Sequence, residues 1–364
     1  MKIMGPNFPE GKCDIVSCTE CGFVFNAYES ATQKDFNDYY ISNNSKTVNY
    51  YDMLSADLAD TYFEHLYNGI KKYINKESQI LDVAGGYGEF SKYLLDKGYL
   101  NVSLLEMKTE CIQYAKNIGI NVIEGNLLEI EDIKHKYDLV ICSHDLEHFI
   151  DIDKAIDKMR DMVKSSGYIF IEVPDIEEYE KLDRAPYHFL TYEHVCHFSE
   201  NTLYNIANKF GFSIEYLERY VKCNDYPCLY GVFTVGNKEK GMTKDEISMD
   251  AMKRYVVQCE NEIAQATKVF EENQDPLIIW GIGASTAQLL NGNFDRCNVI
   301  QLVDSNKSRQ GIGFNISGRN LKVSDPMDIT DREATIFILP TAYKESIMKS
   351  IRSYGLDNNV VSLK

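Results

Sequence analysis

The stretch Ile80-Leu81-Asp82-Val83-Ala84-Gly85-Gly86-Tyr87-Gly88-Glu89-Phe90 decides the fold of this chain. The segment 79–83, with Ile80, Leu81 and Val83, predicts a buried strand; small residues follow directly, and the segment 90–97 has the pattern of a helix. Small residues let a backbone approach a ligand closely, and a helix N-terminus offers unpaired N–H groups. Twenty residues after Gly86, Glu106 ends the next strand, where a carboxylate can accept hydrogen bonds from ribose hydroxyls. The stretch therefore predicts a nucleotide-binding turn.

Strands and helices alternate after this turn. We expect strands at 102–105, 122–123, 137–142 and 168–173, with helices at 110–118 and 153–163. Such alternation implies a mainly parallel sheet with right-handed crossovers. Segments 212–219 and 229–236 have no helix between them and are expected to close the sheet as an antiparallel pair. A sheet of this kind binds ligands beyond the carboxyl ends of its strands.

The chain has 364 residues, which at about 150 residues per domain suggests two domains. We expect an irregular N-terminal segment at 1–50, an α/β domain at 51–240 and a second α/β domain at 241–364. The last part opens with a long amphipathic helix at 245–272, after which the alternation of strands and helices starts again. The oligomeric state is not readable from these patterns.

Composition excludes several classes of partner. The chain carries 38 basic and 55 acidic residues, a net charge of −17, which repels nucleic-acid phosphates and anionic lipid. Apolar runs such as 168–173 are far too short to span a bilayer, and the first residues lack an apolar signal region. We therefore expect a cytoplasmic protein that binds neither nucleic acid nor membranes. Its ten cysteines are mostly scattered, so we expect free thiols.

Four segments together resemble the class I S-adenosylmethionine-dependent methyltransferases. They are residues 81–90, Leu104-Leu105-Glu106, Gly125-Asn126-Leu127, and the strand-and-turn segment 137–148. The resemblance covers about residues 78–175 and implies a Rossmann-like α/β fold with S-adenosylmethionine as cofactor. The residues it assigns to the cofactor are Asp82, Ala84, Gly85, Gly86, Gly88, Glu106, Asn126, Leu127, Ser143 and His144. Ala84 stands where that family usually has glycine, and Asn126 where it often has aspartate. A plain NAD-binding fold is the alternative.

The stretch Tyr187-His188-Phe189-Leu190-Thr191-Tyr192-Glu193-His194-Val195-Cys196-His197-Phe198-Ser199 holds three of the seven histidines. It follows the fifth strand, where a loop would lie over the cofactor. A neutral histidine can act as a base near pH 7, and a neighbouring carboxylate can orient it. We therefore expect His194 to be catalytic, with Glu193 and Tyr192 beside it. The alternative is that Glu193 and His197 only cap a helix that starts near 199–201, with Ser199 as its N-cap.

The whole chain resembles the sugar C-methyltransferases that act on nucleotide-linked 4-keto sugars. The features shared are the methyltransferase sheet, the Glu193-His194 pair before Phe198-Ser199, and a second Rossmann-like half. The resemblance implies a small-molecule substrate, a nucleotide sugar, from which His194 removes the proton α to the keto group so that the enolate attacks the methyl sulfonium. That family has Tyr-His before the pair, where this chain has Thr191-Tyr192. Methylation of a sugar or other small-molecule hydroxyl is one alternative, and a cofactor-binding module without methyl transfer is another.

Three remaining features leave alternatives open. Cys18-x-x-Cys21 has the spacing of one zinc knuckle, whereas the family that the chain resembles carries two such cysteine pairs. A structural zinc ion needs four ligands, and only Cys13, with His65 or a distant thiol, could complete the set. We therefore predict no metal. Residues 277–286 and Asp304 have dinucleotide-fingerprint spacing without the third glycine, and in the family resembled this half helps to enclose the sugar nucleotide and has no redox cofactor of its own. The tyrosine pairs at 39–40 and 50–51 either cover the active site or pack as core residues.

Overall fold

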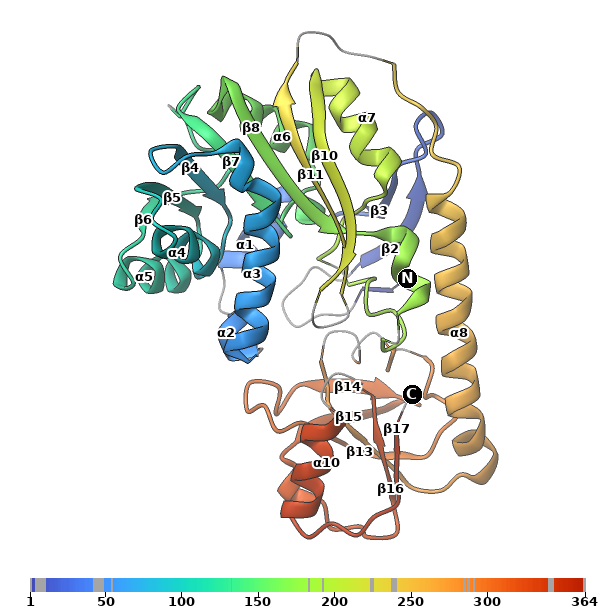
Figure 1. Ribbon diagram of the computed structural model, residues 1–364. Helices are drawn as coiled ribbons and strands as arrows, with labels where there is room; N and C mark the ends of the chain where they lie inside the picture. Colours follow the sequence, from blue (N-terminus) through green and yellow to red (C-terminus); the bar gives the residue numbers. More distant parts are fainter. Residues whose placement is uncertain are drawn as a thin grey trace. The chain divides into compact units, whose positions relative to one another are not determined.

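The computed structural model describes residues 2–3, 11–41, 49–53, 55–131, 133–182, 184–191, 193–222, 226–236, 241–283, 286, 289–290, 292–339 and 344–362 (Figure 1). Two compact units divide the chain. One comprises residues 14–179 and 193–251, and the other comprises 1–13, 180–192 and 252–364. Whether the boundaries expected at 50/51 and 240/241 mark independent domains stays a prediction. In the described part of the chain, no helix combines the length and apolar composition needed to cross a membrane.

A seven-stranded sheet forms the centre of the first unit. Its strands are β4 (Gln79–Val83), β5 (Asn101–Glu106), β6 (Asn121–Glu124), β7 (Tyr137–Ser143), β8 (Val163–Pro174), β10 (Phe212–Val221) and β11 (Pro227–Val235). Their order is β10-β11-β8-β7-β4-β5-β6. Within this sheet, neighbouring strands among β4 to β8 pair in parallel, and β11 pairs antiparallel with both β8 and β10. The parallel sheet and its closing antiparallel pair are thus confirmed.

The order of the strands places a switch point in this sheet. From β4 the chain moves outward through β5 to β6, and then returns to the other side of β4 as β7. The loops after β4 and β7 therefore leave the carboxyl edge in opposite directions. In open α/β sheets this is where ligands bind. The loop after β4 is the glycine-rich turn on which the sequence analysis centred.

Helices connect the strands as the periodicity predicts. They are α3 (Ala56–Ile70), η1 (Lys71–Tyr73), α4 (Glu89–Asp96), α5 (Thr109–Asn117), η2 (Leu146–His148), α6 (Ile152–Met162), η3 (Ile176–Lys181) and α7 (Glu200–Phe210). One face of α3 packs into a core with the sheet that includes Phe63, Leu66 and Phe170. Helix α7 begins at the predicted N-cap: the Ser199 side chain accepts a hydrogen bond from the N–H of Thr202. It ends at Gly211, whose φ of 69° suits glycine.

The N-terminal segment is not irregular, and this expectation was wrong. It contains β1 (Lys2–Ile3), β2 (Gly11–Ser17), β3 (Val24–Tyr28), α1 (Gln33–Ile41) and α2 (Tyr50–Met53). Strand β3 pairs antiparallel with β9 (Cys196–His197), which lies about 170 residues further along the chain. A strand whose partner is so distant leaves little trace in local sequence pattern. The pairing brings the N-terminal segment next to the predicted acceptor loop.

The second unit contains its own mixed sheet. Its elements are the remainder of α8 (Ser248–Asn273), β12 (Leu277–Trp280), β13 (Val299–Val303), β14 (Gly313–Ile316), β15 (Arg319–Ser324), η4 (Pro326–Asp328), β16 (Thr335–Ile338), α10 (Lys344–Ser353) and β17 (Val360–Ser362). The order is β14-β15-β13-β12-β16-β17, parallel except for the β14–β15 hairpin. Trp280 is fully buried in this unit's core. The second α/β half is thus confirmed.

Candidate cofactor and acceptor site

Residues 84–88 make a tight turn between β4 and α4. The backbone φ angles of Ala84, Gly86 and Gly88 are 51°, 59° and 76°, in the left-handed region that L side chains avoid. The N–H of Ala84 donates to the carbonyl of Leu105 at 2.8 Å, and the N–H of Gly88 donates to the carbonyl of Gly85 at 2.9 Å. Ala84 therefore occupies a strained conformation where the related family carries glycine.

Asp82 lies directly under this turn. A Cβ atom at Gly85 would sit 2.5 Å from Oδ2 of Asp82, so only glycine fits there. The same Oδ2 accepts a hydrogen bond from the hydroxyl of Ser91 at 2.8 Å. Burial, assisted by the nearby charge of Glu106, raises the pKa of Asp82 to about 7. The Asp82 carboxylate thus packs against one side of the turn, and we expect a ligand to bind on the other side.

Glu106 ties the end of β5 to the turn. Its Oε2 accepts the N–H of Gly86 at 3.1 Å, and its Oε1 accepts the N–H groups of Met107 and Lys108, each at 2.8 Å. A carboxylate can accept about four hydrogen bonds, so roughly one acceptor position remains for a ligand hydroxyl. Burial raises the pKa of Glu106, and the three N–H donors oppose that rise. The residue predicted to hold the ribose is therefore preorganised.

Asn126 and Leu127 lie beside this carboxylate, at the end of β6. The N–H of Gly125 donates to the carbonyl of Glu106 at 2.9 Å, which joins the two strand ends. Oδ1 of Asn126 accepts the N–H of Leu128 at 2.9 Å, and its Nδ2 is 3.6 Å from Sδ of Met107. Leu127 is buried. The structure thus brings the residues predicted for the turn, the ribose and the adenine edge to one edge of the sheet.

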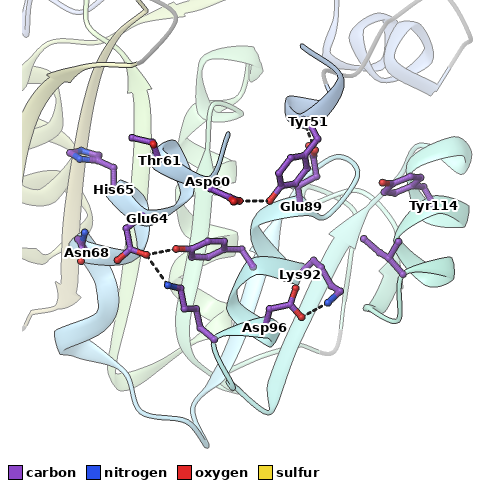
Figure 2. Close-up of a pocket in the computed structure, with 13 residues that line it drawn as sticks. Tyr51, Asp60, Thr61, Glu64, His65, Asn68, Glu89, Lys92, Asp96 and Tyr114 are labelled. Atoms are coloured by element: carbon purple, nitrogen blue, oxygen red, sulfur yellow. Dashed lines mark hydrogen bonds and ion pairs between the residues drawn. The ribbon is translucent and has the colours of Figure 1, made fainter. Parts of the chain in front are cut away.

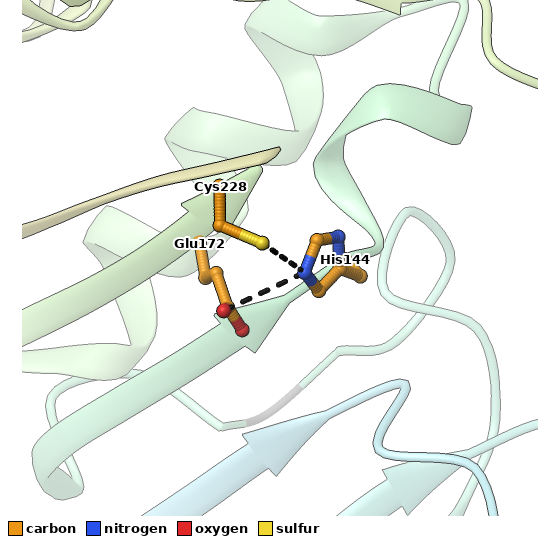
Figure 3. A group of neighbouring side chains, drawn as sticks. All are labelled: His144, Glu172 and Cys228. Carbon is orange, nitrogen blue, oxygen red and sulfur yellow. Dashed lines mark hydrogen bonds and ion pairs between the residues drawn. The ribbon is translucent and has the colours of Figure 1, made fainter. Parts of the chain in front are cut away.

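Ser143 and His144, at the end of β7, face acidic side chains. Ser143 donates its hydroxyl to Oε2 of Glu172. Nδ1 of His144 lies 3.3 Å from Oε1 of Glu147, and its Nε2 lies 3.5 Å from Oε1 of Glu172 and 3.5 Å from Sγ of Cys228 (Figure 3). Burial favours the neutral ring, but the surrounding acidic groups hold the pKa of His144 well above its usual value. The imidazole thus lies between two buried carboxylates that favour its protonated form, and its predicted contact with the cofactor stays a prediction.

A second polar group at this edge was not predicted from sequence. Glu172 is fully buried and accepts hydrogen bonds from Tyr62, at 2.8 Å, and from Tyr220. The ammonium of Lys222 lies 4.1 Å from the ring centre of Tyr62 and donates to the hydroxyl of Tyr50 at 3.2 Å. One signal could have found this group: Glu172 is an acid inside the otherwise apolar strand segment 168–173, where a charge needs partners.

The Glu193–His194 turn lies next to His148. Oε1 of Glu193 accepts the hydroxyl of Tyr39 at 2.8 Å, and Nδ1 of His148 lies 2.8 Å from both the carbonyl oxygen of Glu193 and the hydroxyl of Tyr40. Because α7 is capped by Ser199, Glu193 does not serve as its cap. Tyrosine hydroxyls of the N-terminal segment therefore contact Glu193 and His148, and whether these tyrosines cover an active site stays a prediction.

His194 itself is held neutral by its surroundings. Burial and the neighbouring His148 lower its pKa to about 3, and its Nδ1 is buried without a hydrogen-bond partner in the described structure. A histidine with this pKa holds a proton weakly, so His194 would need other groups to help it remove a proton. Its role as the base stays a prediction. His197 is fully buried between Asn26 and Tyr179 and is structural. Tyr192 lies outside the described residues.

A surface pocket lies elsewhere in this unit, over α3 and α4 (Figure 2). It encloses about 890 Å³ and is lined by Tyr51, Asp60, Thr61, Glu64, His65, Asn68, Glu89, Lys92, Tyr93, Asp96, Lys97, Tyr114 and Ile118. Its charged groups largely satisfy one another: Glu64 pairs with Lys97 at 2.8 Å, and Lys92 pairs with Asp96. None of the residues predicted for the cofactor or the acceptor lines it. We therefore do not take this pocket as the reaction site.

The structure describes the turn of the cysteine cluster and part of the C-terminal fingerprint. The N–H of Gly22 donates to the carbonyl of Cys18 at 2.9 Å, which closes the knuckle-like turn, and Cys13 is buried. In the second unit Oδ2 of Asp304 accepts the N–H of Ile282 at 2.7 Å. The following residues 284 and 285 lie outside the described part. That the cysteine cluster binds no zinc, and that the second unit binds no dinucleotide of its own, both stay predictions.

Comparisons with known proteins agree with this geometry. Residues 57–217 match the methyltransferase domain family. A malonyl-[acyl-carrier protein] O-methyltransferase of Acetivibrio thermocellus is 28% identical over 134 residues, which is 36% of this chain and 46% of that protein. The chain thus spans less than half the length of this curated relative.

Solved structures of methyltransferases also match in part. An S-adenosylmethionine-dependent methyltransferase of Mesorhizobium loti is 14% identical, with 46% of this chain and 96% of that one covered and a TM-score of 0.40. The 1,6-didemethyltoxoflavin-N1-methyltransferase of Burkholderia thailandensis, solved with S-adenosylhomocysteine, is 12% identical, with 62% and 100% covered and a TM-score of 0.43.

The family match and the site geometry agree over residues 57–217, which are less than half of the chain. The matched residues 57–217 form a class I S-adenosylmethionine-dependent methyltransferase domain, and its cofactor is S-adenosylmethionine. The turn at residues 84–88 and Glu106 fit that cofactor: a Cβ at Gly85 would fill the turn, and the buried carboxylate keeps an acceptor position for a ligand hydroxyl.

Proposed function

We propose that this chain transfers a methyl group from S-adenosylmethionine to a small-molecule acceptor. The observation that carries the proposal is the joint placement of the glycine turn and Glu106, whose carboxylate accepts the N–H of Gly86 at 3.1 Å. Bound there, the cofactor supplies an electrophilic methyl group. The chain's own task is to hold the acceptor in line with that methyl, since positioning supplies much of the rate of such a transfer.

The acceptor we propose is the carbon next to the keto group of a nucleotide-linked sugar. Polar side chains from the Glu193–His194 turn, from η2 and from the end of β8 gather at the carboxyl edge of the sheet, on the β7 side of the switch point. For a keto sugar, these residues must hold the carbonyl oxygen and remove the proton from the neighbouring carbon. The new carbon–carbon bond then forms as the methyl–sulfur bond breaks. A sugar hydroxyl is the alternative acceptor, because it would present an oxygen and a proton to the same groups.

Cofactor binding is tested first, by isothermal titration with S-adenosylmethionine and, separately, with NAD. We expect S-adenosylmethionine to bind at one site per chain. Binding of NAD alone would contradict the proposal. If S-adenosylmethionine binds but no product forms from a broad panel of nucleotide sugars, followed by mass spectrometry, the chain is a cofactor-binding module and the proposed transfer is wrong.

The carbon and oxygen acceptors are separated by hydrogen exchange. Keto sugar nucleotides are incubated in heavy water with the protein and S-adenosylhomocysteine, so that methyl transfer cannot proceed. Deuterium entering the position next to the keto group supports carbon methylation. An oxygen-linked methyl group in the product, with no exchange in any keto sugar, establishes the hydroxyl acceptor instead.

A further inference from the structure

Three metal-ligating side chains meet at the acceptor edge of the sheet. Glu147 and His148 come from η2, directly after β7, and His194 comes from the turn before β9. One ligand atom from each of these residues lies within 4.8 Å of those of the other two. A carboxylate and two imidazoles at such spacing are the donor set that divalent first-row transition metals prefer in sites with open positions.

Two of these side chains carry buried atoms that lack a partner. Glu147 is 1% exposed; its Oε1 faces the His144 cation at 3.3 Å, while its Oε2 has no hydrogen-bond partner within the described structure. Nδ1 of His194 is likewise buried and unpaired there. Buried polar atoms are rarely left without a partner, and here two belong to one cluster. Oε2 of Glu147 can only accept, and Nδ1 of His194 carries a lone pair in one of the two neutral tautomers, so a single cation would satisfy both atoms.

The third side chain is oriented as a ligand. Nδ1 of His148 lies 2.8 Å from the carbonyl oxygen of Glu193. A carbonyl oxygen can only accept, so this contact places the ring proton on Nδ1 and the lone pair on Nε2. Histidines that bind metals are commonly fixed in this way, with the second ring nitrogen donating to a carbonyl or carboxylate. Both histidines are partly exposed, whereas Glu147 is buried, so the cluster is reached from the histidine side.

We propose that Glu147, His148 and His194 bind a divalent transition-metal ion, with the remaining coordination positions open to an oxygen of the acceptor. The role of the ion rests on the proposed function: it would hold the keto or hydroxyl oxygen and stabilise the negative charge that develops there when the proton leaves. As a ligand of the ion, His194 does not act as the base, and the proton passes to solvent water. The binding of the ion itself does not depend on the identity of the acceptor.

The neighbouring group of His144, Glu172 and Cys228 has similar spacing but lacks this support (Figure 3). Glu172 already accepts hydrogen bonds from Tyr62, Tyr220 and Ser143. The nearby Lys222 ammonium acts on both Glu172 and Cys228 and opposes a second cation. We therefore assign the ion to the first cluster only.

The test is a titration of the chelator-treated full chain with Mn²⁺, followed by the loss of the free-ion electron paramagnetic resonance signal. We expect one bound ion per chain, and an affinity at least about tenfold lower in Glu147→Gln and in His194→Ala. Two variants are matched controls: Cys228→Ser, in the second cluster, and Cys18→Ser, in the cysteine knuckle. Both should bind Mn²⁺ with the affinity of the unchanged chain. Retention of binding in both ligand variants, or loss in the two controls alone, would overturn the assignment.

A second measurement covers variants that fail to fold. Pulsed electron paramagnetic resonance of the unchanged chain loaded with Cu²⁺ should show magnetic coupling to imidazole nitrogen; its absence, or the absence of any bound ion, contradicts the proposal. Cofactor binding is followed in parallel by titration with S-adenosylmethionine. A chain that binds S-adenosylmethionine but no ion refutes the metal site and leaves the proposed function intact, whereas ion binding without cofactor binding refutes the proposed function alone.

Discussion

The carboxylate of Glu106 accepts a hydrogen bond from the backbone N–H of Gly86 at 3.1 Å, across the gap between the end of β5 and the turn after β4. The acid therefore has a structural task before any ligand arrives, because it holds the turn in its left-handed conformation. Its Oε1 also accepts two N–H groups that begin the next loop. A single buried carboxylate thus organises both sides of the predicted cofactor site.

We predict that Glu106→Gln weakens binding of S-adenosylmethionine about 10- to 100-fold. Glutamine keeps the size of the side chain and one acceptor oxygen, but its amide lacks the charge and places a donor against backbone N–H groups, which costs about 1–3 kcal/mol. Isothermal titration measures the change. Glu124→Gln is the matched control, because Glu124 ends the neighbouring strand β6 in register with Glu106 but is exposed. Equal effects of the two substitutions would contradict the assignment.

We predict that Gly85→Ala impairs both folding and cofactor binding. The added Cβ would lie 2.5 Å from Oδ2 of Asp82, so the turn or the carboxylate must move, at a cost of about 1–3 kcal/mol. Gly241→Ala is the control, because a Cβ there meets nothing within 4 Å. Urea unfolding and titration with S-adenosylmethionine should both separate the two variants. A Gly85→Ala chain with unchanged affinity would show that the turn does not cradle the cofactor.

The cofactor half of the site was largely predictable because its signals are local. A strand, a run of small residues and a helix follow each other within residues 79–97, and the acids at 106 and 304 each stand at the end of the next strand. In the structure both acids accept an N–H from the preceding turn. Short-range spacing along the chain is enough to place such residues, since consecutive parallel strands share one carboxyl edge.

The acceptor half was less predictable because its partners are distant in sequence. Glu193 was expected to orient His194, but its carboxylate is bonded to Tyr39, which comes from a segment that was expected to be irregular. The sequence analysis placed Glu147 and His148 only in the strand-and-turn segment 137–148. They lie near His194 because the loop after β8 folds back beside η2. The β3–β9 pairing that positions this loop joins residues about 170 apart. Local periodicity carries no information on such contacts.

We predict a pH-dependent stability difference between the unchanged chain and Asp82→Asn. The pKa of Asp82 is raised from 3.8 to about 7 in the folded state, chiefly by burial. Between these values the folded chain binds a proton that the unfolded chain does not, so this contribution to stability is complete below pH 4 and is lost as the pH rises to 7. Asparagine does not titrate. The Tm of Asp82→Asn relative to the unchanged chain should therefore rise from pH 4 to 7 and level off above pH 8.

The control for this prediction is Ser91→Ala. The Ser91 hydroxyl donates to Asp82 and lowers its pKa, so removing it should move the pH window upward and leave its direction unchanged. Thermal unfolding without ligand, at intervals between pH 4 and 9, gives both curves. A difference between Asp82→Asn and the unchanged chain that is constant over this range would show that Asp82 is ionised in the folded state at all these values.

We predict that His144→Ala destabilises the chain by about 3–5 kcal/mol, because it leaves Glu147 and Glu172, both fully buried, without the cation that lies between them. The backbone adds to this cost, since His144 has a φ of 53° and alanine tolerates the left-handed region poorly. The variant His135→Ala separates the loss of the charge from the backbone cost. His135 has nearly the same φ, 51°, but its ring contacts the carbonyl of Val163, at 3.1 Å, and no buried carboxylate among the described residues. We expect His135→Ala to show the backbone cost alone, about 1–2 kcal/mol in urea unfolding. If both variants lose the same stability, the two carboxylates do not depend on the imidazolium, and the charge arrangement at the end of β7 is different from the one described.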